Sequence, residues 1–319
     1  MQSQKSNRKK NPLDFLRYQE FLLSLVIIAI MVAMSFISPY FFTLQNIRGL
    51  LIGTTMVGII SVGMVGVLAT GGLDLSVGSV LAFAGVIAGL SLKAGVPTIF
   101  AVIFALLAAG AVGLINGLCV AKLEFDPFIT TLATMIMVRG FLLVISGGHA
   151  VTEMTESYNV LGQSEFLSFQ YPVYYFFVIA ILGAFFFHSI RIFRLTYYVG
   201  SNEEAARLSG INVALVKTLG YVIVAVLAGV SGVCMSARMG MASVTIGQAT
   251  NLQVLAACVI GGSSFRGGQG TVLGAALGAF LLQLLVNSLN IAGMGIYWQQ
   301  VFTGGVLLGA IALDRLKRW

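Results

Sequence analysis

The chain has 319 residues, of which 58% are hydrophobic and only 9% are charged. A soluble domain carries about a quarter charged residues, so this composition excludes an ordinary soluble domain and favours helices that face lipid. The net charge of +7 would suggest nucleic acid as the partner of a soluble protein, but the positions of the charges give a better account, and we expect no nucleic-acid binding.

Apolar runs long enough to span a membrane recur along the chain, each needing about 20 mostly apolar residues. The first run is followed by Ser-Pro-Tyr-Phe-Phe and not by a small-residue cleavage site, so we expect a retained helix. The eighth run is short, and its helix can begin earlier. We predict an all-α, polytopic transmembrane bundle of about ten helices, covering residues 20–37, 49–69, 75–93, 97–120, 127–146, 171–188, 213–236, 252–262, 271–290 and 297–313.

Lysine and arginine gather in alternate connections between these helices. If the N-terminus is cytoplasmic, the outside segments hold only Arg48, Lys93 and Arg238, Arg139 falls within a helix, and the rest of the 18 Lys and Arg residues lie inside. Cytoplasmic loops of membrane proteins are enriched in these residues. The pattern predicts that both termini are cytoplasmic, which requires an even number of crossings. Residues 1–19 are then a cytoplasmic segment and residues 20–319 a single transmembrane domain.

An acidic residue interrupts the boundary between the second and third predicted helices, in Gly71-Gly-Leu-Asp74-Leu-Ser76-Val-Gly78. The two glycines permit a sharp bend, and Asp74 is suited to cap the next helix, where its charge matches the positive helix end. The same pattern also fits a broken helix that lines a translocation path. Both interpretations can hold together.

A short helix is predicted between two membrane spans, near residues 201–210. Ser201 and Glu204 have the spacing of a capping box, and Gly210 is suited to end the helix. A helix of barely two turns is unstable alone in water, so we expect it to pack on its own bundle or on a partner.

The glycine-rich stretch 261–270 precedes the ninth predicted helix. It lacks the Gly-Lys-Ser/Thr ending of a phosphate-binding loop, so we expect a flexible cytoplasmic turn. The sequence contains two histidines, and it shows no metal-ligand spacing, no Ser-His-Asp set and no paired carboxylates. We therefore expect no metal site, no catalytic residue and no cofactor bound by this chain. Cys119, Cys234 and Cys258 lie within apolar runs and are expected to be buried apolar residues.

The segment Glu204-Ala-Ala followed by Gly210 resembles the coupling segment of ATP-binding-cassette (ABC) importer permeases, in the version found in the ribose/xylose/arabinose/galactose permease family. Four further motifs match this family in the same order along the chain. They are Gly71-Gly-Leu-Asp-Leu-Ser-Val-Gly78, Gly113-Leu-Ile-Asn-Gly117, Phe128-Ile-Thr-Thr-Leu-Ala-Thr-Met135 with Arg139-Gly140, and Ala256-Ala-Cys-Val-Ile-Gly-Gly262.

The resemblance implies a permease subunit of a sugar importer in the bacterial inner membrane. A separate ATPase, expected to be a twin-domain protein, would bind ATP and Mg²⁺, a periplasmic binding protein would deliver the sugar, and a second copy or a paralogue would complete the pathway. The implied contacts with the ATPase are Ser201, Glu203, Glu204, Ala205, Ala206, Arg207 and Gly210.

Neutral polar residues within the apolar runs suit a sugar, which offers hydroxyls and no charge, but they serve equally as hydrogen bonds between helices. The candidate residues of the path or gate are Asp74, Ser76, Asn116, Thr131, Arg139 and Asn287. Arg139 needs a partner or water inside a span. A secondary transporter driven by an ion gradient is the alternative, although it would usually carry intramembrane acids, and a membrane enzyme is disfavoured by the missing catalytic residues.

Overall fold

The computed structural model describes residues 12–316, which form helices joined by short connections and one small hairpin. The elements are α1 (Pro12–Ile37), α2 (Leu44–Ala69), α3 (Val77–Lys93), α4 (Thr98–Ala121), α5 (Pro127–Ser146), α6 (Glu156–Gln163), β1 (Glu165–Phe166), β2 (Phe169–Gln170), α7 (Tyr171–Ser189), α8 (Arg191–Ser201), α9 (Glu203–Leu208), α10 (Val213–Met239), α11 (Thr250–Ile260), α12 (Val272–Ile291) and α13 (Ile296–Leu316). Most of the predicted segment 1–19, and Lys317 and Arg318 of the basic C-terminus, lie outside the described residues.

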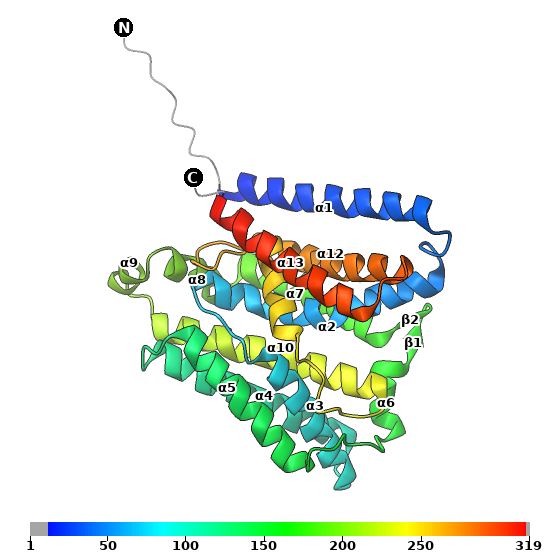
Figure 1. Ribbon diagram of the computed structural model, residues 1–319. Helices are drawn as coiled ribbons and strands as arrows, with labels where there is room; N and C mark the ends of the chain where they lie inside the picture. Colours follow the sequence, from blue (N-terminus) through cyan, green and yellow to red (C-terminus); the bar gives the residue numbers. More distant parts are fainter. Residues whose placement is uncertain (1–11, 317–319) are drawn as a thin grey trace.

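Every predicted range is occupied by a helix. The eighth begins at Thr250, earlier than its apolar run, as predicted. Within the described part of the chain, seven helices are long and apolar enough to cross a membrane: α1, α2, α4, α5, α7, α10 and α12. Helices α3 and α11 are apolar but shorter, because each is preceded by a non-helical segment that occupies part of the depth of the bundle (Figure 1).

Local sequence signals set where the long helices begin and end. Asp126 accepts the Ile129 N–H at 2.9 Å, and Pro127 takes the first position of α5, where its missing N–H costs nothing. Gly147 ends this helix with a φ of 62°. Asn212 caps α10 in the same way as Asp126 caps α5, and Gly240 ends α10 with a φ of 65°. Because these residues suit the termini of helices, the boundaries follow from the sequence.

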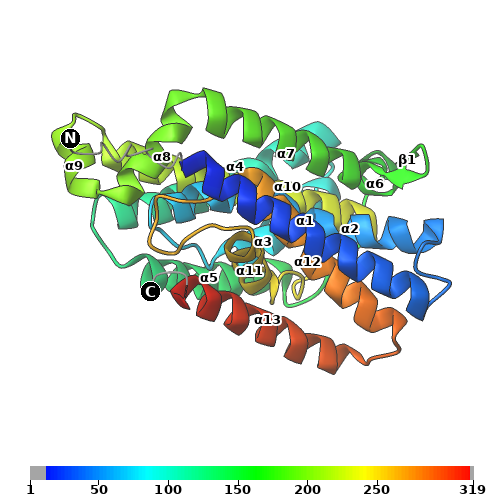
Figure 2. The same cartoon turned by 90° about the horizontal axis from the view of Figure 1, so that it is seen from above.

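Helices α2 and α10 form the centre of the bundle. Helix α10 packs along α2, α3 and α4, and most of α2 from Thr54 onward is buried. A Cβ on Gly113 would lie 2.5 Å from the Tyr221 carbonyl oxygen, and one on Gly117 would lie 2.7 Å from Thr218 Cα. These glycines allow α4 to approach α10 closely, as their four-residue spacing predicts. Helix α1 lies at the edge, against α12 (Figures 1 and 2).

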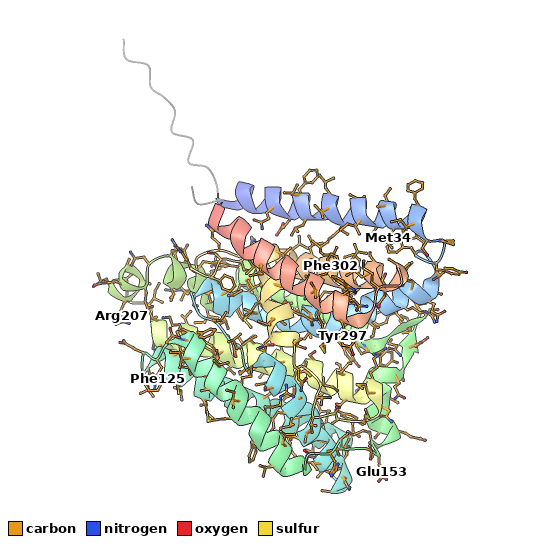
Figure 3. The ribbon with its side chains drawn as sticks, in the orientation of Figure 1. Met34, Phe125, Glu153, Arg207, Tyr297 and Phe302 are labelled. Atoms are coloured by element: carbon orange, nitrogen blue, oxygen red, sulfur yellow. The ribbon has the colours of Figure 1, made fainter. Side chains whose placement is uncertain are left out.

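The connections divide between two ends of the bundle. Helix α9, the start of α1 and the end of α13 lie at one end, whereas α6 and the β1–β2 hairpin lie at the other (Figures 1 and 2). Figure 3 places Arg207 and Phe125 at the first end and Met34 and Glu153 at the second. The loops that the charge pattern assigns to opposite sides of a membrane are therefore at opposite ends of the molecule.

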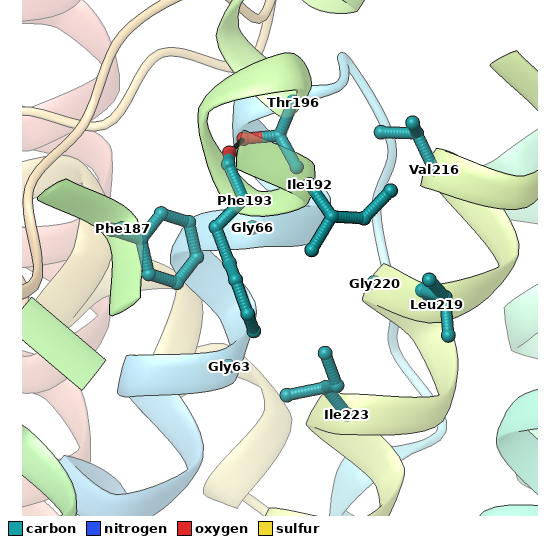
Figure 4. A pocket seen from close by; sticks show the side chains of 10 residues that line it. All are labelled: Gly63, Gly66, Phe187, Ile192, Phe193, Thr196, Val216, Leu219, Gly220 and Ile223. Atoms are coloured by element: carbon teal, nitrogen blue, oxygen red, sulfur yellow. Dashed lines mark hydrogen bonds between the residues drawn. The ribbon is translucent and has the colours of Figure 1, made fainter. Parts of the chain in front are cut away.

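The sequence analysis did not predict helix α8, which leads from α7 to α9. Its apolar residues recur at helical spacing, and Phe193 and Tyr197 pack against the core. Figure 4 shows the side chains of α8 meeting α2 and α10 around a void of about 30 Å³. The Thr196 hydroxyl is bonded to the Phe193 carbonyl at 2.6 Å, so the void offers little to hold a water molecule.

Candidate functional site

A non-helical segment, residues 70–76, enters the bundle between α2 and α3. Gly71 turns the chain with a φ of +77°, and Asp74 is then fully buried, with 0% exposure. Its Oδ1 accepts the Ser76 N–H at 2.7 Å and the Ser76 hydroxyl at 2.6 Å. The predicted cap is therefore corrected: Ser76 occupies the N-cap position of α3, and Asp74 acts two residues earlier because its carboxylate closes a turn on the Ser76 N–H.

Side chains from three other helices hold this segment. Asn116 of α4 donates to the Ser76 hydroxyl at 3.0 Å. Thr131 of α5 donates to the Leu73 carbonyl at 3.4 Å, and Tyr221 of α10 donates to the same oxygen at 3.2 Å. The structure thus brings together four of the predicted path residues, with Tyr221 as a member that the sequence analysis missed.

A second non-helical segment, residues 240–249, enters the bundle from the opposite end and leads into α11. It crosses the start of α3, where a Cβ on Gly78 would lie 2.2 Å from the Gly247 carbonyl oxygen. A Cβ on Gly247, whose φ is +81°, would lie 2.3 Å from the Gly78 oxygen. Only glycine permits this approach of two backbones. Two broken helices therefore meet inside the bundle, an arrangement that many transporters use at their binding sites.

Arg139 links the second broken segment to the first turn of α3. Its Nη1 donates to the Val244 and Ile246 carbonyls at 2.6 and 3.1 Å, and its Nη2 donates to the Gly78 carbonyl at 3.4 Å. The partners that a guanidinium inside a span requires are thus backbone oxygens. They were not visible in the sequence, because each lies more than 60 residues away along the chain.

A cavity of about 400 Å³ opens beside Arg139. Its polar lining residues come from α3, α5, the second broken segment and the start of α11: Ser79, Arg139, Gln248 and Asn251. Apolar side chains such as Met135 complete the wall. A site of this kind offers hydrogen-bonding groups on an apolar wall, which suits a small neutral polar ligand.

Asn287 lies apart from this group. On α12, it exchanges two side-chain hydrogen bonds with Asn46 of α2, at 2.7 and 3.2 Å. A reciprocal pair of amides satisfies both side chains, so this contact has the geometry of a link between helices.

Helix α9 projects from one end of the bundle and carries most of the predicted contacts with the ATPase (Figure 1). Asn202, not Ser201, is its N-cap and accepts the Ala205 N–H at 2.9 Å. Ser201 belongs to the last turn of α8, where its hydroxyl bonds to the Tyr197 carbonyl. The predicted capping box is corrected because α8 continues to Ser201 and leaves Asn202 as the first non-helical residue. Gly210, with a φ of +78°, ends the segment as predicted.

The faces of α9 have different surroundings. Ala206 is 5% exposed and packs with Val199, Val213 and Val216, so it anchors α9 to its own bundle. Glu204, Ala205 and Arg207 are exposed, and Leu208 is 84% exposed. Exposed Leu208 therefore lies beside two exposed residues of opposite charge, Glu204 and Arg207, a combination that suits contact with another protein. Leu208 was not among the predicted contacts, because its position in the sequence does not show that its side chain points outward.

Ion pairs fix α9 against its neighbours. Glu203 accepts from Lys217 of α10 at 2.6 Å and from Arg207 at 3.2 Å. Arg207 also lies 3.9 Å from Glu124, in the connection between α4 and α5. A groove of about 660 Å³ separates α9 from this connection, and exposed Phe125 lies on its far wall.

The glycine-rich stretch 261–270 is held by hydrogen bonds, which corrects the prediction of a flexible turn. The Gly268 N–H donates to the Ala69 carbonyl at 2.8 Å, and the Tyr197 hydroxyl donates to the Gly270 carbonyl at 2.9 Å. Burial raises the pKa of Tyr197 to about 12. The turn therefore joins the end of α2, where the first broken segment begins, to α8, which leads into α9.

The fold and these sites define a polytopic helical membrane protein with broken helices at its centre and an exposed helix at one end. Residues 46–311 match the family model described as the permease component of the branched-chain amino acid transport system. The chain belongs to this family of transport permeases.

Named relatives match almost the whole chain. The ribose import permease protein of Escherichia coli K12 is 35% identical over 98% of both chains. The L-arabinose ABC transporter permease protein of Azospirillum brasilense is 33% identical over 92% of this chain and 87% of its own, and the D-allose transport system permease protein of E. coli K12 is 33% identical over 97% and 95%. No solved structure matches the chain. The predicted resemblance to ABC sugar permeases is confirmed.

Proposed function

We propose that this chain is the membrane permease of an ABC importer for a monosaccharide or a related polyol, and that it forms the path by which the sugar crosses the bacterial inner membrane. The observation that carries the path is the meeting of two broken helices at Gly78 and Gly247, beside the cavity at Arg139. The neutral donors and acceptors there match sugar hydroxyls, and the relatives named for ribose, L-arabinose and D-allose favour the same substrate class.

The proposed topology has ten crossings with both termini in the cytoplasm. The seven long spans are completed by α3, α11 and α13. Helices α3 and α11 are too short to cross the membrane alone, and each would cross it together with the broken segment that precedes it. The positions of α9 and the ends of α1 and α13 at one end of the bundle support this even number (Figures 1 and 2), as does the distribution of lysine and arginine.

The polar cavity also supports a dimer. Arg139, Gln248 and Asn251 line this cavity, and polar groups at membrane depth are tolerated where they face protein or water, not lipid. A second copy or a paralogue would cover these residues and complete the path. A periplasmic binding protein would deliver the sugar at the end that carries α6 and the hairpin.

The chain is proposed to bind no cofactor, and a partner ATPase would bind ATP and Mg²⁺. This ATPase would dock on α9 through Glu204, Ala205, Arg207 and Leu208. Closure of the ATPase would then move α9, and the anchored Ala206 would transmit the movement to α8 and α10.

The test is reconstitution of the permease with its ATPase and binding protein in lipid vesicles. We expect sugar uptake that requires ATP, and ATPase activity that the loaded binding protein stimulates. Uptake by the permease alone, driven by an ion gradient, would overturn the proposal in favour of a secondary transporter.

Gly210→Pro tests the coupling site. Proline requires a φ near −65° and has no N–H, whereas Gly210 has a φ of +78° and its N–H donates to the Arg207 carbonyl at 3.0 Å. We expect about a tenfold or greater loss of uptake and weaker ATPase docking, with normal membrane insertion. Glu204→Arg, which changes only an exposed charge, should also weaken docking. Normal uptake in both variants would remove the case for α9 as the coupling helix.

A further inference from the structure

Two unpaired oxygens in the centre of the bundle belong to side chains that share one hydroxyl. The Ser76 hydroxyl donates to Asp74 Oδ1 at 2.6 Å and accepts from Asn116 Nδ2 at 3.0 Å. The remaining oxygens, Asp74 Oδ2 and Asn116 Oδ1, are buried and have no hydrogen-bond partner. Both side chains have 0% exposure, so bulk water does not satisfy them.

The surroundings of Asp74 do not provide a positive charge. Among the described residues, the four ion pairs involve other carboxylates. The ionisable groups nearest along the contacts already described are Arg139, which reaches the Gly78 carbonyl, and Tyr221, which reaches the Leu73 carbonyl. Neither bonds to the carboxyl group. A buried carboxylate without a cation is unfavourable, because the two neutral donors from Ser76 replace only part of its hydration.

We propose that Asp74 is a neutral carboxylic acid whose proton sits on Oδ2, the carboxyl oxygen without a partner. An ionised carboxylate only accepts hydrogen bonds, whereas a protonated one has a donor. A single proton then removes the buried charge and turns Oδ2 from an unpaired acceptor into a donor. The result is an uncharged chain of hydrogen bonds through Asp74, Ser76 and Asn116.

Exchange of the amide oxygen and nitrogen of Asn116 is the other arrangement to weigh, since the two atoms are assigned from their contacts. The exchanged amide would offer its oxygen to the Ser76 hydroxyl, which can rotate to donate to it, while the Ser76 N–H still donates to Asp74. The carboxylate would then keep its charge in the buried site. Infrared spectroscopy distinguishes the two arrangements, because only the proposed one contains a protonated carboxylic acid.

The neutral acid gives Asp74 a positioning role in the proposed path. Through Ser76 and Asn116 it ties the first broken segment to α4 without adding a second charge to that of Arg139. This role rests on the proposed function, but the protonation state does not, so the two are tested by different measurements.

The experiment compares Asp74→Asn with wild type by infrared difference spectroscopy of the permease in lipid. We expect the wild type to show the carbonyl stretch of a protonated carboxylic acid, confirmed by its isotope shift after labelling with ¹³C-aspartate, and Asp74→Asn to lack it. Asp126→Asn is the matched control: Asp126 is an exposed aspartate whose Oδ1 also accepts a backbone N–H, and its replacement should leave that band intact. Loss of an ionised carboxylate band in Asp74→Asn would overturn the proposal.

Inactivation in detergent provides a second measurement that does not need transport. Asparagine is uncharged and its amide oxygen can accept from Ser76 as the neutral acid does, so Asp74→Asn should keep a half-life within about twofold of wild type, whereas Asp74→Ala should shorten it about tenfold or more. Equal losses in the two variants would show that the charge itself is needed. If the infrared result holds while vesicles show no sugar uptake, the proposed function fails and the protonation state stands.

Discussion

Arg139 shows how a single side chain can hold two backbone segments in place. Its guanidinium reaches the Val244 and Ile246 carbonyls of the second broken segment and the Gly78 carbonyl in the first turn of α3. Because its donors are arranged in a planar fork, arginine can bridge such carbonyls, whereas lysine presents one compact charge. The side chain of Arg139 therefore holds the backbone in the geometry of the proposed path.

Replacing Arg139 by lysine is expected to lower the free energy of unfolding by about 1.5–3 kcal/mol, since at least one carbonyl loses a charge-assisted hydrogen bond. The measurement is unfolding of the purified permease in mixed micelles. Arg48→Lys is the control, because Arg48 lies 3.9 Å from Glu165 in a partly exposed pair, which contributes about 0–1 kcal/mol. An Arg139→Lys variant as stable as Arg48→Lys would contradict the role of the fork.

The Asn46–Asn287 pair separates a structural role from a role in the path. We expect Asn46→Ala to lower stability at least as much as Asn287→Ala, and a double-mutant cycle to give a coupling energy of about 0.6 kcal/mol, and not above about 1.7. Both single variants remove the two hydrogen bonds between the amides, and Asn46→Ala also removes the bond from Asn46 Nδ2 to the Phe41 carbonyl at 2.7 Å, so Asn46→Ala should reduce uptake at least as much as Asn287→Ala. A larger loss of uptake in Asn287→Ala alone would place Asn287 in the path.

At the scale of elements, the helices followed from the sequence more readily than the segments between them. Long apolar runs ended by Gly147 and Gly240 determine a helix locally. The partners of Arg139 could not be predicted, because they are backbone oxygens brought near by the folding of distant segments. The N-cap at Ser201 was wrong for a related reason: α8 is stabilised by packing of Phe193 and Tyr197 on the core, which a local capping pattern does not report.

Two glycines of α10 are expected to respond oppositely to alanine. A Cβ on Gly220 would meet Val67 Cγ2 at 3.7 Å, an ordinary contact, whereas one on Gly232 would lie 2.0 Å from the Leu81 carbonyl oxygen. Gly220→Ala should stabilise the permease by about 0.5–1 kcal/mol, and Gly232→Ala should destabilise it by about 1–3 kcal/mol because α3 must move away from α10. Thermal unfolding of both variants tests this, and a stable Gly232→Ala protein would contradict the close approach.

At the scale of the whole molecule, the arrangement joins the two sites. The turn 261–270 bonds to Ala69 at the start of the first broken segment and to Tyr197 of α8, next to α9. A movement of α9 therefore has a short physical route to the segment that contains Asp74. Coupling of this kind needs two discrete states of the connecting element, which binding and release of the ATPase would supply.

The topology is tested by placing single cysteines at the two ends of the bundle. The three native cysteines would first be replaced by alanine; Cys234 and Cys258 are buried and Cys119 is partly buried. Glu156, in the first turn of α6, and Leu208, in α9, are exposed at opposite ends. We expect a membrane-impermeant maleimide to label Glu156→Cys in intact cells whose outer membrane is permeable, and Leu208→Cys only after the inner membrane is opened. In the proposed topology α9 and both termini lie on the side of the ATPase, so labelling of Leu208→Cys from outside would invert the topology and remove α9 from its proposed partner.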